Sequence, residues 1–149
     1  DLHLLYNVLI SFEEVDPDRM GISGLSGGGT LTYLTAALDD RFRAAAVFCG
    51  TGGYRDYAGG EGCGMQTVPG WFPRADTAEF FALIAPRPLL VVQGKYDATF
   101  NVLRTGQVVR QAAPAYAAAG VPQHLRFRVP ELAHEFDPDL AAEFFTEFL

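Results

Sequence analysis

The segment with the clearest chemical potential is Gly24-Leu25-Ser26-Gly27-Gly28, where a serine stands in the spacing G-x-S-x-G. It follows the strand-like stretch Met20–Ser23 and precedes a helix-forming stretch. So tight a reversal from strand to helix strains the backbone of the central residue and requires small neighbours on both sides. The serine hydroxyl then stands above the sheet as a nucleophile, and the Gly27 amide can donate to an oxyanion.

Glycine-rich turns after strands also bind phosphate groups, which is the main alternative interpretation of this segment. The segment does not lead into the lysine of a phosphate-binding loop, and no acidic residue stands where a ribose contact is expected. The sequence therefore favours a serine nucleophile.

Two downstream loops offer the base and the acid that a serine nucleophile needs. Asp97 follows the apolar run Leu89–Val92, and His134 follows the alternating stretch Leu125–Val129. Catalytic groups gather in the loops at the carboxyl ends of parallel strands. The chain order of serine, acid and histidine is the order found after such a turn. We therefore predict Ser26 as nucleophile, Asp97 as acid and His134 as base.

Other acidic and histidine residues are candidates for the same roles. Asp56 stays open as an alternative acid, because some hydrolases place this carboxylate one strand earlier. His3 precedes the nucleophile and is expected at the surface, whereas His124 precedes its strand and is expected at the wrong end of the sheet. Asp137 and Asp139 are better explained as helix caps.

Strands and helices are expected to alternate along the chain. Apolar spacing predicts helices near residues 2–12, 31–38, 78–84, 101–119 and 137–148. Strands are expected at residues 20–23, 44–48, 89–92 and 125–129, the last of them near a sheet edge. Pro114 should kink or break the helix that contains it. This alternation predicts an α/β fold, with a mostly parallel sheet and helices on both faces.

A long loop is expected between residues 50 and 74, where Gly, Tyr, Asp and Pro follow no regular period. Such loops often carry binding surfaces. We expect Trp71 and Phe72 to line this surface and to contact the substrate.

Composition limits the class of partner. The 149 residues carry a net charge of −7, and no cluster of Lys and Arg is present, which argues against nucleic acid or an anionic membrane as partner. No apolar stretch has the length needed to span a bilayer. Cys49 and Cys63 fit neither a disulfide framework nor a metal-ligand spacing, so we expect free thiols, with Cys49 buried. A bond between the two cysteines is the alternative that stays open. The cellular compartment stays open.

Three stretches carry a family resemblance: Val15–Gly29, Ile84–Gly94 and Ala133–Phe136. With them the chain resembles the C-terminal half of α/β-hydrolases of the acetyl-xylan-esterase and dienelactone-hydrolase-like group. The resemblance implies the α/β-hydrolase fold, the roles predicted above, hydrolysis of small acyl esters that are often acetylated sugars, and no metal or organic cofactor. Dienelactone hydrolases proper use a cysteine where this chain has Ser26, so their particular chemistry is not expected.

The resemblance also implies an incomplete fold. Complete members have several strands ahead of the nucleophile, but here one helix and one strand reach Ser26. We expect residues 1–149 to be the C-terminal catalytic part of one α/β-hydrolase domain, with the N-terminal strands missing and residues 20–23 at a sheet edge. The N-terminal half of the same protein is then the expected partner, because the loop that gives the second oxyanion donor precedes the nucleophile.

Two other functions stay open. A serine exopeptidase of the prolyl-oligopeptidase type has a similar Gly-Gly run and the same order of catalytic residues, although residues 84–90 look more like the esterases. A non-catalytic module of the same fold is the second alternative. It is disfavoured because all three catalytic residue types are present.

Overall fold

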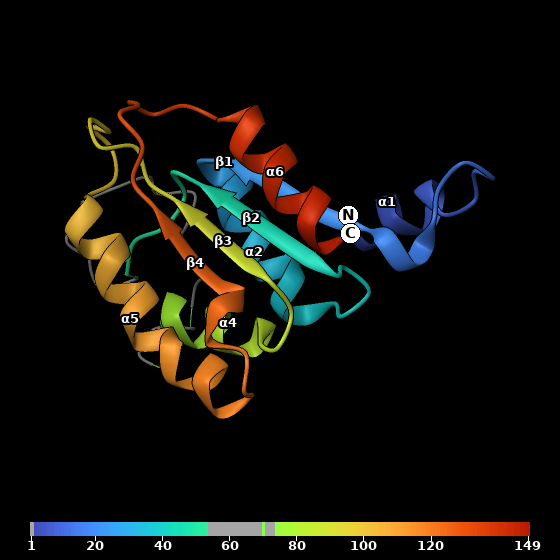
Figure 1. The fold of residues 1–149 in the computed structure, drawn as a ribbon, viewed down its shortest axis with the longest axis horizontal. Coiled ribbons are helices and arrows are strands. Elements are labelled where there is room, and N and C mark those ends of the chain that lie inside the picture. Colours follow the sequence, from blue (N-terminus) through green and yellow to red (C-terminus); the bar gives the residue numbers. More distant parts are fainter. Residues whose placement is uncertain (1, 54–69, 71–73) are drawn as a thin grey trace.

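Four parallel strands form the centre of the molecule, and their order across the sheet is their order along the chain, β1-β2-β3-β4 (Figure 1). The computed structural model describes residues 2–53, 70 and 74–149. Its helices and strands are α1 (Leu2–Leu9), β1 (Gly21–Leu25), α2 (Gly27–Leu38), β2 (Ala44–Phe48), α4 (Thr77–Ile84), β3 (Leu89–Val92), α5 (Val102–Ala118), β4 (Leu125–Arg128) and α6 (Pro138–Phe148). Two short 3-10 helices cover Pro17–Arg19 and Pro122–His124.

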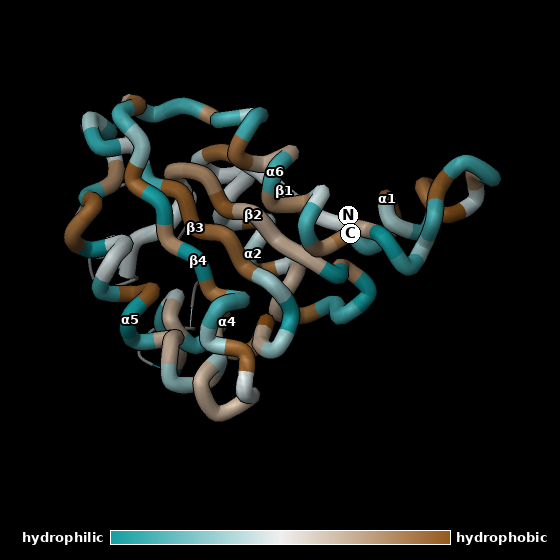
Figure 2. The backbone as a smooth tube through the Cα atoms, viewed as in Figure 1, coloured by the Kyte–Doolittle hydropathy of each residue, from teal (hydrophilic) through white to brown (hydrophobic). Residues whose placement is uncertain are grey.

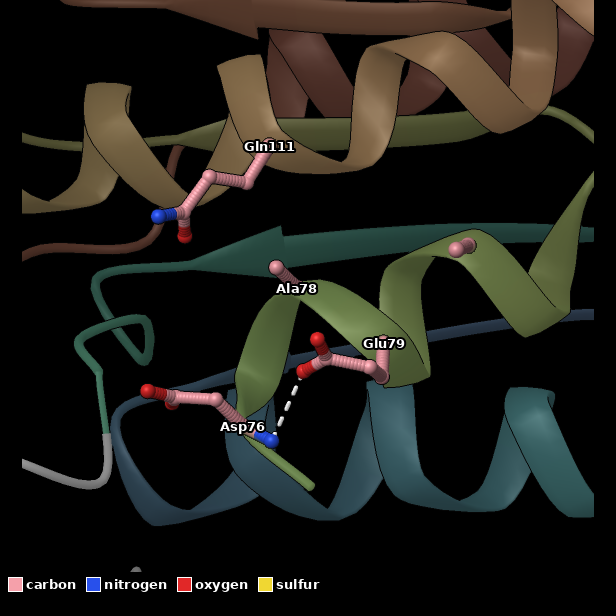
Figure 3. A pocket seen from close by; sticks show the side chains of 5 residues that line it. Asp76, Ala78, Glu79 and Gln111 are labelled. Atoms are coloured by element: carbon pink, nitrogen blue, oxygen red, sulfur yellow. Dashed lines mark hydrogen bonds between the residues drawn. The ribbon is translucent and has the colours of Figure 1, made fainter. Parts of the chain in front are cut away.

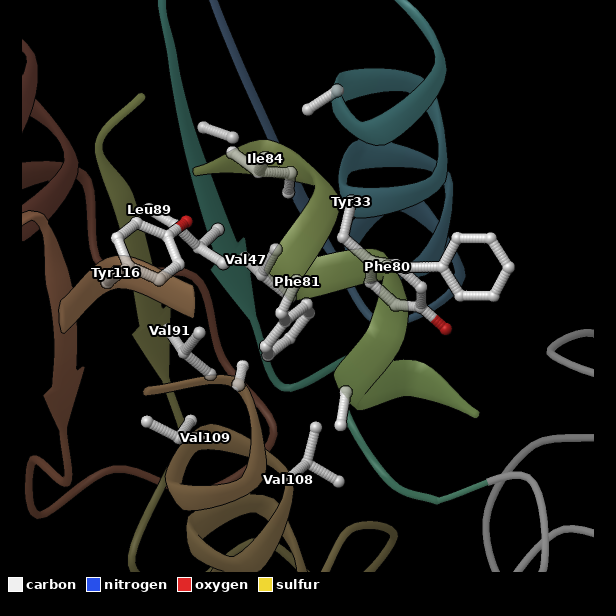
Figure 4. Packing of buried hydrophobic residues seen from close by; sticks show 14 of the residues in the cluster. Tyr33, Val47, Phe80, Phe81, Ile84, Leu89, Val91, Val108, Val109 and Tyr116 are labelled. Carbon is white, nitrogen blue, oxygen red and sulfur yellow. The ribbon is translucent and has the colours of Figure 1, made fainter. Parts of the chain in front are cut away.

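The handedness of the connections explains which helices cover which face. The strands advance in one direction across the sheet, and right-handed crossovers then place each connecting helix on the same side. Helices α2, α4 and α5 accordingly share one apolar cluster with one face of β2 and β3 (Figures 1 and 4). Helix α6 follows the last strand and packs on the opposite face. The expected parallel sheet with helices on both faces is confirmed.

The buried strands owe their continuous apolar sequence to this double cover. In β2, Ala45 and Val47 point to the cluster with α2, α4 and α5, whereas Ala44, Ala46 and Phe48 point to the cluster with α6. Every residue of β2 and β3 is buried, and Figure 2 shows hydrophobic colour along both strands. Burial on both faces therefore explains why these strands have no polar alternation.

The two edge strands of the sheet, β1 and β4, each have one strand neighbour among the described residues. Strand β1 pairs with β2, and β4 pairs with β3, without a further described neighbour. This places residues 20–23 at a sheet edge and confirms the half-exposed edge position expected for the last strand.

Within the described part of the chain, no helix combines the length and apolar character that crossing a bilayer requires.

Pro114, which was expected to kink its helix or break it, does not divide it into two pieces. Helix α5 is one element from Val102 to Ala118. The Asn101 side chain caps its start by accepting from the Leu103 and Arg104 amides, and Gly120, whose φ is 77°, follows its end. Pro114 lies on the exposed side of this helix. Water can therefore satisfy the carbonyl that the missing N–H leaves unpaired.

The apolar stripes that predict α1 and α2 are only partly buried. In α1 the buried residue is Tyr6, while Leu5 is 51% exposed. In α2, Leu31 and Leu38 are exposed, and the buried face consists of Thr, Tyr and small residues. The helices were predicted correctly, but their leucines do not mark the faces that pack on the sheet.

Asp39 links the end of α2 to α1. Its buried carboxylate accepts hydrogen bonds from Arg41 Nε at 2.8 Å and Arg41 Nη2 at 2.6 Å, and lies 2.7 Å from His3 Nδ1. The Arg41 guanidinium holds the pKa of Asp39 well below its usual range, against the opposing effect of burial, and His3 adds to this lowering. His3 is half-exposed, as expected, but it takes part in this anchor.

We expect Asp39→Asn to reduce the free energy of unfolding by about 1–3 kcal/mol, because charged hydrogen bonds to a buried group are lost. A lowered pKa stabilises the fold fully above the unfolded-state pKa of about 4, and this contribution is lost as the pH falls below it. The difference between wild type and variant, measured by urea unfolding, should therefore shrink from pH 7 to pH 3. An equal difference at both pH values would contradict the prediction.

Candidate active site

Ser26 occupies the sharp turn expected between β1 and α2. Its backbone has φ 59° and ψ −121°, in the left-handed region that strains a residue with a side chain. The amide donates to Phe48 O at 2.9 Å, and the hydroxyl forms no cap bond with the following helix. The backbone of Ser26 therefore fixes the position of its side chain, and the hydroxyl is not used to cap the helix.

The small residues of this turn are not equally required. A Cβ atom at Gly24 would lie 2.4 Å from the Gly28 carbonyl, so only glycine fits at Gly24. A Cβ atom at Gly28 would meet no atom within 4 Å beyond its own helix. The predicted need for small neighbours is thus correct before the serine, but space does not impose it at Gly28. Gly27 begins α2, so its N–H is among those without a partner inside the helix.

Asp97 and His134 meet across the carboxyl ends of β3 and β4. His134 Nδ1 lies 3.0 Å from Asp97 Oδ2, and the Asp97 side chain is fully buried while that of His134 is 32% exposed. Burial alone would raise the pKa of Asp97, but hydrogen bonds from His134, the Thr99 amide, Gln93 and the Phe100 amide hold it below its usual value. The carboxylate is thus ionised at neutral pH, and Nδ1 of His134 is its donor.

Cys49 connects the loop of His134 to the end of β2. Its buried Sγ lies 3.7 Å from Ala133 O and 3.8 Å from Glu135 O, the carbonyls on either side of His134. It also accepts from the Gly94 amide at 3.4 Å. Sequence reasoning predicted the burial of Cys49 but not these contacts, and the available signal was its place at the end of a central strand.

Ser26 and the loop of His134 are consequently both bound to the carboxyl end of β2, at the adjacent residues Phe48 and Cys49. Ser26 is bound to Phe48 O, and the residues beside His134 are bound to Cys49. The described residues show no hydrogen bond between the Ser26 hydroxyl and His134. Catalytic hydrogen bonds are often long in free enzymes and tighten when substrate binds, so direct contact between the two stays a prediction.

Cys49, Asp97 and His134 also have the donor types of a metal site, with ligand atoms within 4.8 Å of one another. However, Asp97 and His134 are hydrogen-bonded to each other. Burial raises the pKa of the Cys49 thiol, which disfavours the thiolate that a metal needs. We therefore interpret the cluster as a hydrogen-bonded unit.

The remaining candidates lie away from this unit or outside the described residues. His124 Nδ1 lies 2.7 Å from Pro86 O, at the opposite end of the sheet, as expected. Asp137 caps α6 by accepting from the Leu140 amide at 2.9 Å, while Asp139 lies in the first turn of that helix. Four residues named from the sequence lie outside the described residues: Asp56, Cys63, Trp71 and Phe72.

A hollow of about 420 Å³ lies between α4 and α5 (Figure 3). It is lined by Asp76, Ala78, Glu79, Ala82 and Gln111. Asp76 and Glu79 form a capping box at the start of α4, in which the Asp76 amide donates to Glu79. These acidic groups are explained by helix capping, and none of the predicted catalytic residues lines the hollow.

Comparison with known proteins shows which family the chain resembles. The acetyl xylan esterase (AXE1) family matches residues 1–50, the segment that contains Ser26. The protein YtaP of Bacillus subtilis (strain 168), named as a hydrolase, is 29% identical over 114 residues, which make up 74% of this chain and 38% of YtaP.

Solved structures share the fold of this chain. The methylesterase BT1017 is 30% identical and superposes with a TM-score of 0.75 over 98% of this chain and 33% of its own. A family 15 glucuronoyl esterase from Teredinibacter turnerae T7901 shares the fold, with a TM-score of 0.76 at 23% identity over 97% of this chain and 44% of its own. The chain spans less than half the length of each of these three relatives. The chain has the α/β-hydrolase fold and resembles the acetyl-xylan-esterase-like group.

Proposed function

We propose that the chain provides the nucleophile, base and acid of a serine esterase that cleaves small carboxylic esters, acetyl esters among them. The observation that carries this proposal is the hydrogen bond between Asp97 and a partly exposed His134, at the end of the sheet where Ser26 occupies its strained turn. These are the three roles that acyl transfer by a serine requires.

The hydrogen-bonding pattern supports a definite proton path. Because Nδ1 of His134 donates to Asp97, Nε2 is the unprotonated nitrogen and can accept the Ser26 proton. Ser26 Oγ then bonds to the ester carbonyl carbon, and the ionised Asp97 stabilises the imidazolium. The Gly27 amide donates to the oxyanion. His134 returns the proton to the departing alcohol, which leaves an acyl group on Ser26.

The second half of the reaction uses the same groups. Water gives a proton to His134 Nε2 and attacks the acyl carbon. The tetrahedral intermediate then collapses, the carboxylic acid is released, and His134 returns the proton to Ser26. No redox step or organic cofactor is needed for this cycle.

The relatives support an ester as substrate. Both solved structures described above and the matched family are named as esterases, and a net charge of −7 suits a neutral or weakly charged small molecule. We further propose that residues 1–149 form the C-terminal catalytic part of a longer hydrolase domain. Its N-terminal half would then supply the second oxyanion donor and part of the substrate cleft.

A fluorophosphonate probe tests this proposal in the full-length protein. It should label Ser26, as identified by mass spectrometry of the modified peptide, because an activated serine attacks phosphorus as it attacks an acyl carbon. Labelling should fall strongly in His134→Ala, which lacks the base. Labelling of a different serine, or faster turnover of an alanine p-nitroanilide than of p-nitrophenyl acetate, would favour another enzyme or the exopeptidase alternative.

A further inference from the structure

We propose that Gln93 is a positioning residue that holds the carboxylate of Asp97 in the orientation that His134 requires, an inference that rests on the proposed function. Gln93 directly follows β3, four residues before Asp97, and was not singled out by its sequence. It is fully buried, at 0% exposure, which is uncommon for a glutamine. Such a side chain needs partners for its amide.

The Gln93 amide group has acceptors for its NH₂ on one side. Nε2 donates to Asp97 Oδ2 at 2.8 Å and to Phe100 O at 3.2 Å. On the other side, the Thr105 hydroxyl lies 3.3 Å from Gln93 Oε1, and the same hydroxyl lies 2.8 Å from Thr51 O. Reversal of the amide would place its oxygen against a carboxylate and a carbonyl. The surroundings therefore select this one orientation of the amide.

The two oxygens of Asp97 are held by different groups. Oδ1 accepts from the Thr99 amide at 2.7 Å and the Phe100 amide at 3.1 Å. The two oxygens move together when the carboxylate turns about the Cβ–Cγ bond, so a donor to Oδ2 adds to the restraint that these two amides impose. Oδ2 accepts from Gln93 Nε2 and lies 3.0 Å from His134 Nδ1, and the buried Cys49 thiol also interacts with the Asp97 carboxylate. Gln93 is thus a fully buried donor that binds the same oxygen as the base and restrains its orientation.

A positioning role makes a specific kinetic prediction in the full-length enzyme. Gln93→Met keeps an unbranched side chain of similar length but removes the donor, and Gln93→Glu places an oxygen where Nε2 stood. We expect kcat for p-nitrophenyl acetate to fall about 10- to 100-fold, with KM within about threefold, because misplaced supporting groups reduce turnover by such factors. The glutamate variant should lose more, because its oxygen faces Asp97 Oδ2.

Thr77→Val provides the matched control. Thr77 is also 0% exposed, and its hydroxyl donates to Gly52 O at 2.7 Å, so this variant also loses a buried hydrogen bond but none that touches Asp97. Its kcat should stay within about threefold of wild type. A loss equal to that of Gln93→Met would assign the effect to general destabilisation and overturn the proposal.

A spectroscopic measurement separates this inference from the proposed function. The His134 Nδ1 proton, bound to a buried carboxylate, should give a proton NMR signal far downfield that disappears in His134→Ala. The signal should shift or broaden in Gln93→Met and stay in place in Thr77→Val, whether or not the protein hydrolyses esters. A wild type without esterase activity would refute the proposed function alone. An unchanged signal and unchanged kcat in both Gln93 variants would refute the positioning role alone.

Discussion

Ser26→Ala in the full-length protein is expected to lower kcat for a short p-nitrophenyl ester by at least about a thousandfold, as loss of a serine nucleophile generally does. The variant cannot form the acyl-enzyme, because its methyl group offers no atom to attack the carbonyl. The strained turn should persist, since the Ser26 amide bond to Phe48 O and the close approach of Gly24 to Gly28 do not involve the hydroxyl. The measurement is steady-state hydrolysis followed at the absorbance of p-nitrophenolate.

Ser23→Ala is the matched control for this loss. Ser23 lies in β1, three residues earlier, and is exposed. Its variant should keep kcat within about threefold. Cys49 cannot take over the attack, because its thiol is buried and burial raises its pKa. Near-normal hydrolysis by Ser26→Ala would therefore end the serine-esterase interpretation.

The strands could be predicted closely because their signals are local. Residues 44–48 and 89–92 are continuous apolar runs bounded by polar or turn residues, and both are strands over those bounds. The turn at Ser26 was predictable for the same reason, since its glycines and its place between strand and helix lie within a few residues. Asp97 and His134 followed from the rule that catalytic groups gather at strand ends.

The contacts that support these residues could not be predicted in the same way. Cys49 touches carbonyls 84 and 86 residues away, and the amide of Gln93 is fixed in part by Thr105. Neither contact leaves a periodic trace in the sequence. The packing of α1 and α2 was also missed, because apolar period indicates a helix but not how much of its stripe the sheet covers.

Asp97→Asn is expected to lower kcat by about a thousand- to ten-thousandfold, with little change in KM. The Thr99 and Phe100 amides both donate to Oδ1, so the oxygen of an asparagine must occupy that place. Its NH₂ group then stands where Oδ2 accepts from Gln93 and His134. A donor would face two donors.

His134 can relieve this conflict by moving its proton from Nδ1 to Nε2. In that tautomer Nδ1 accepts from the asparagine, but Nε2 can no longer accept the proton of Ser26. The loss should therefore appear in kcat for p-nitrophenyl acetate, and the downfield signal of the Nδ1 proton should vanish in the same variant. Asp56→Asn is the matched comparison, because Asp56 is the alternative acid. The opposite pattern, with Asp56→Asn inactive and Asp97→Asn near normal, would identify Asp56 as the catalytic acid. The bond between Asp97 and His134 would then have only a structural role.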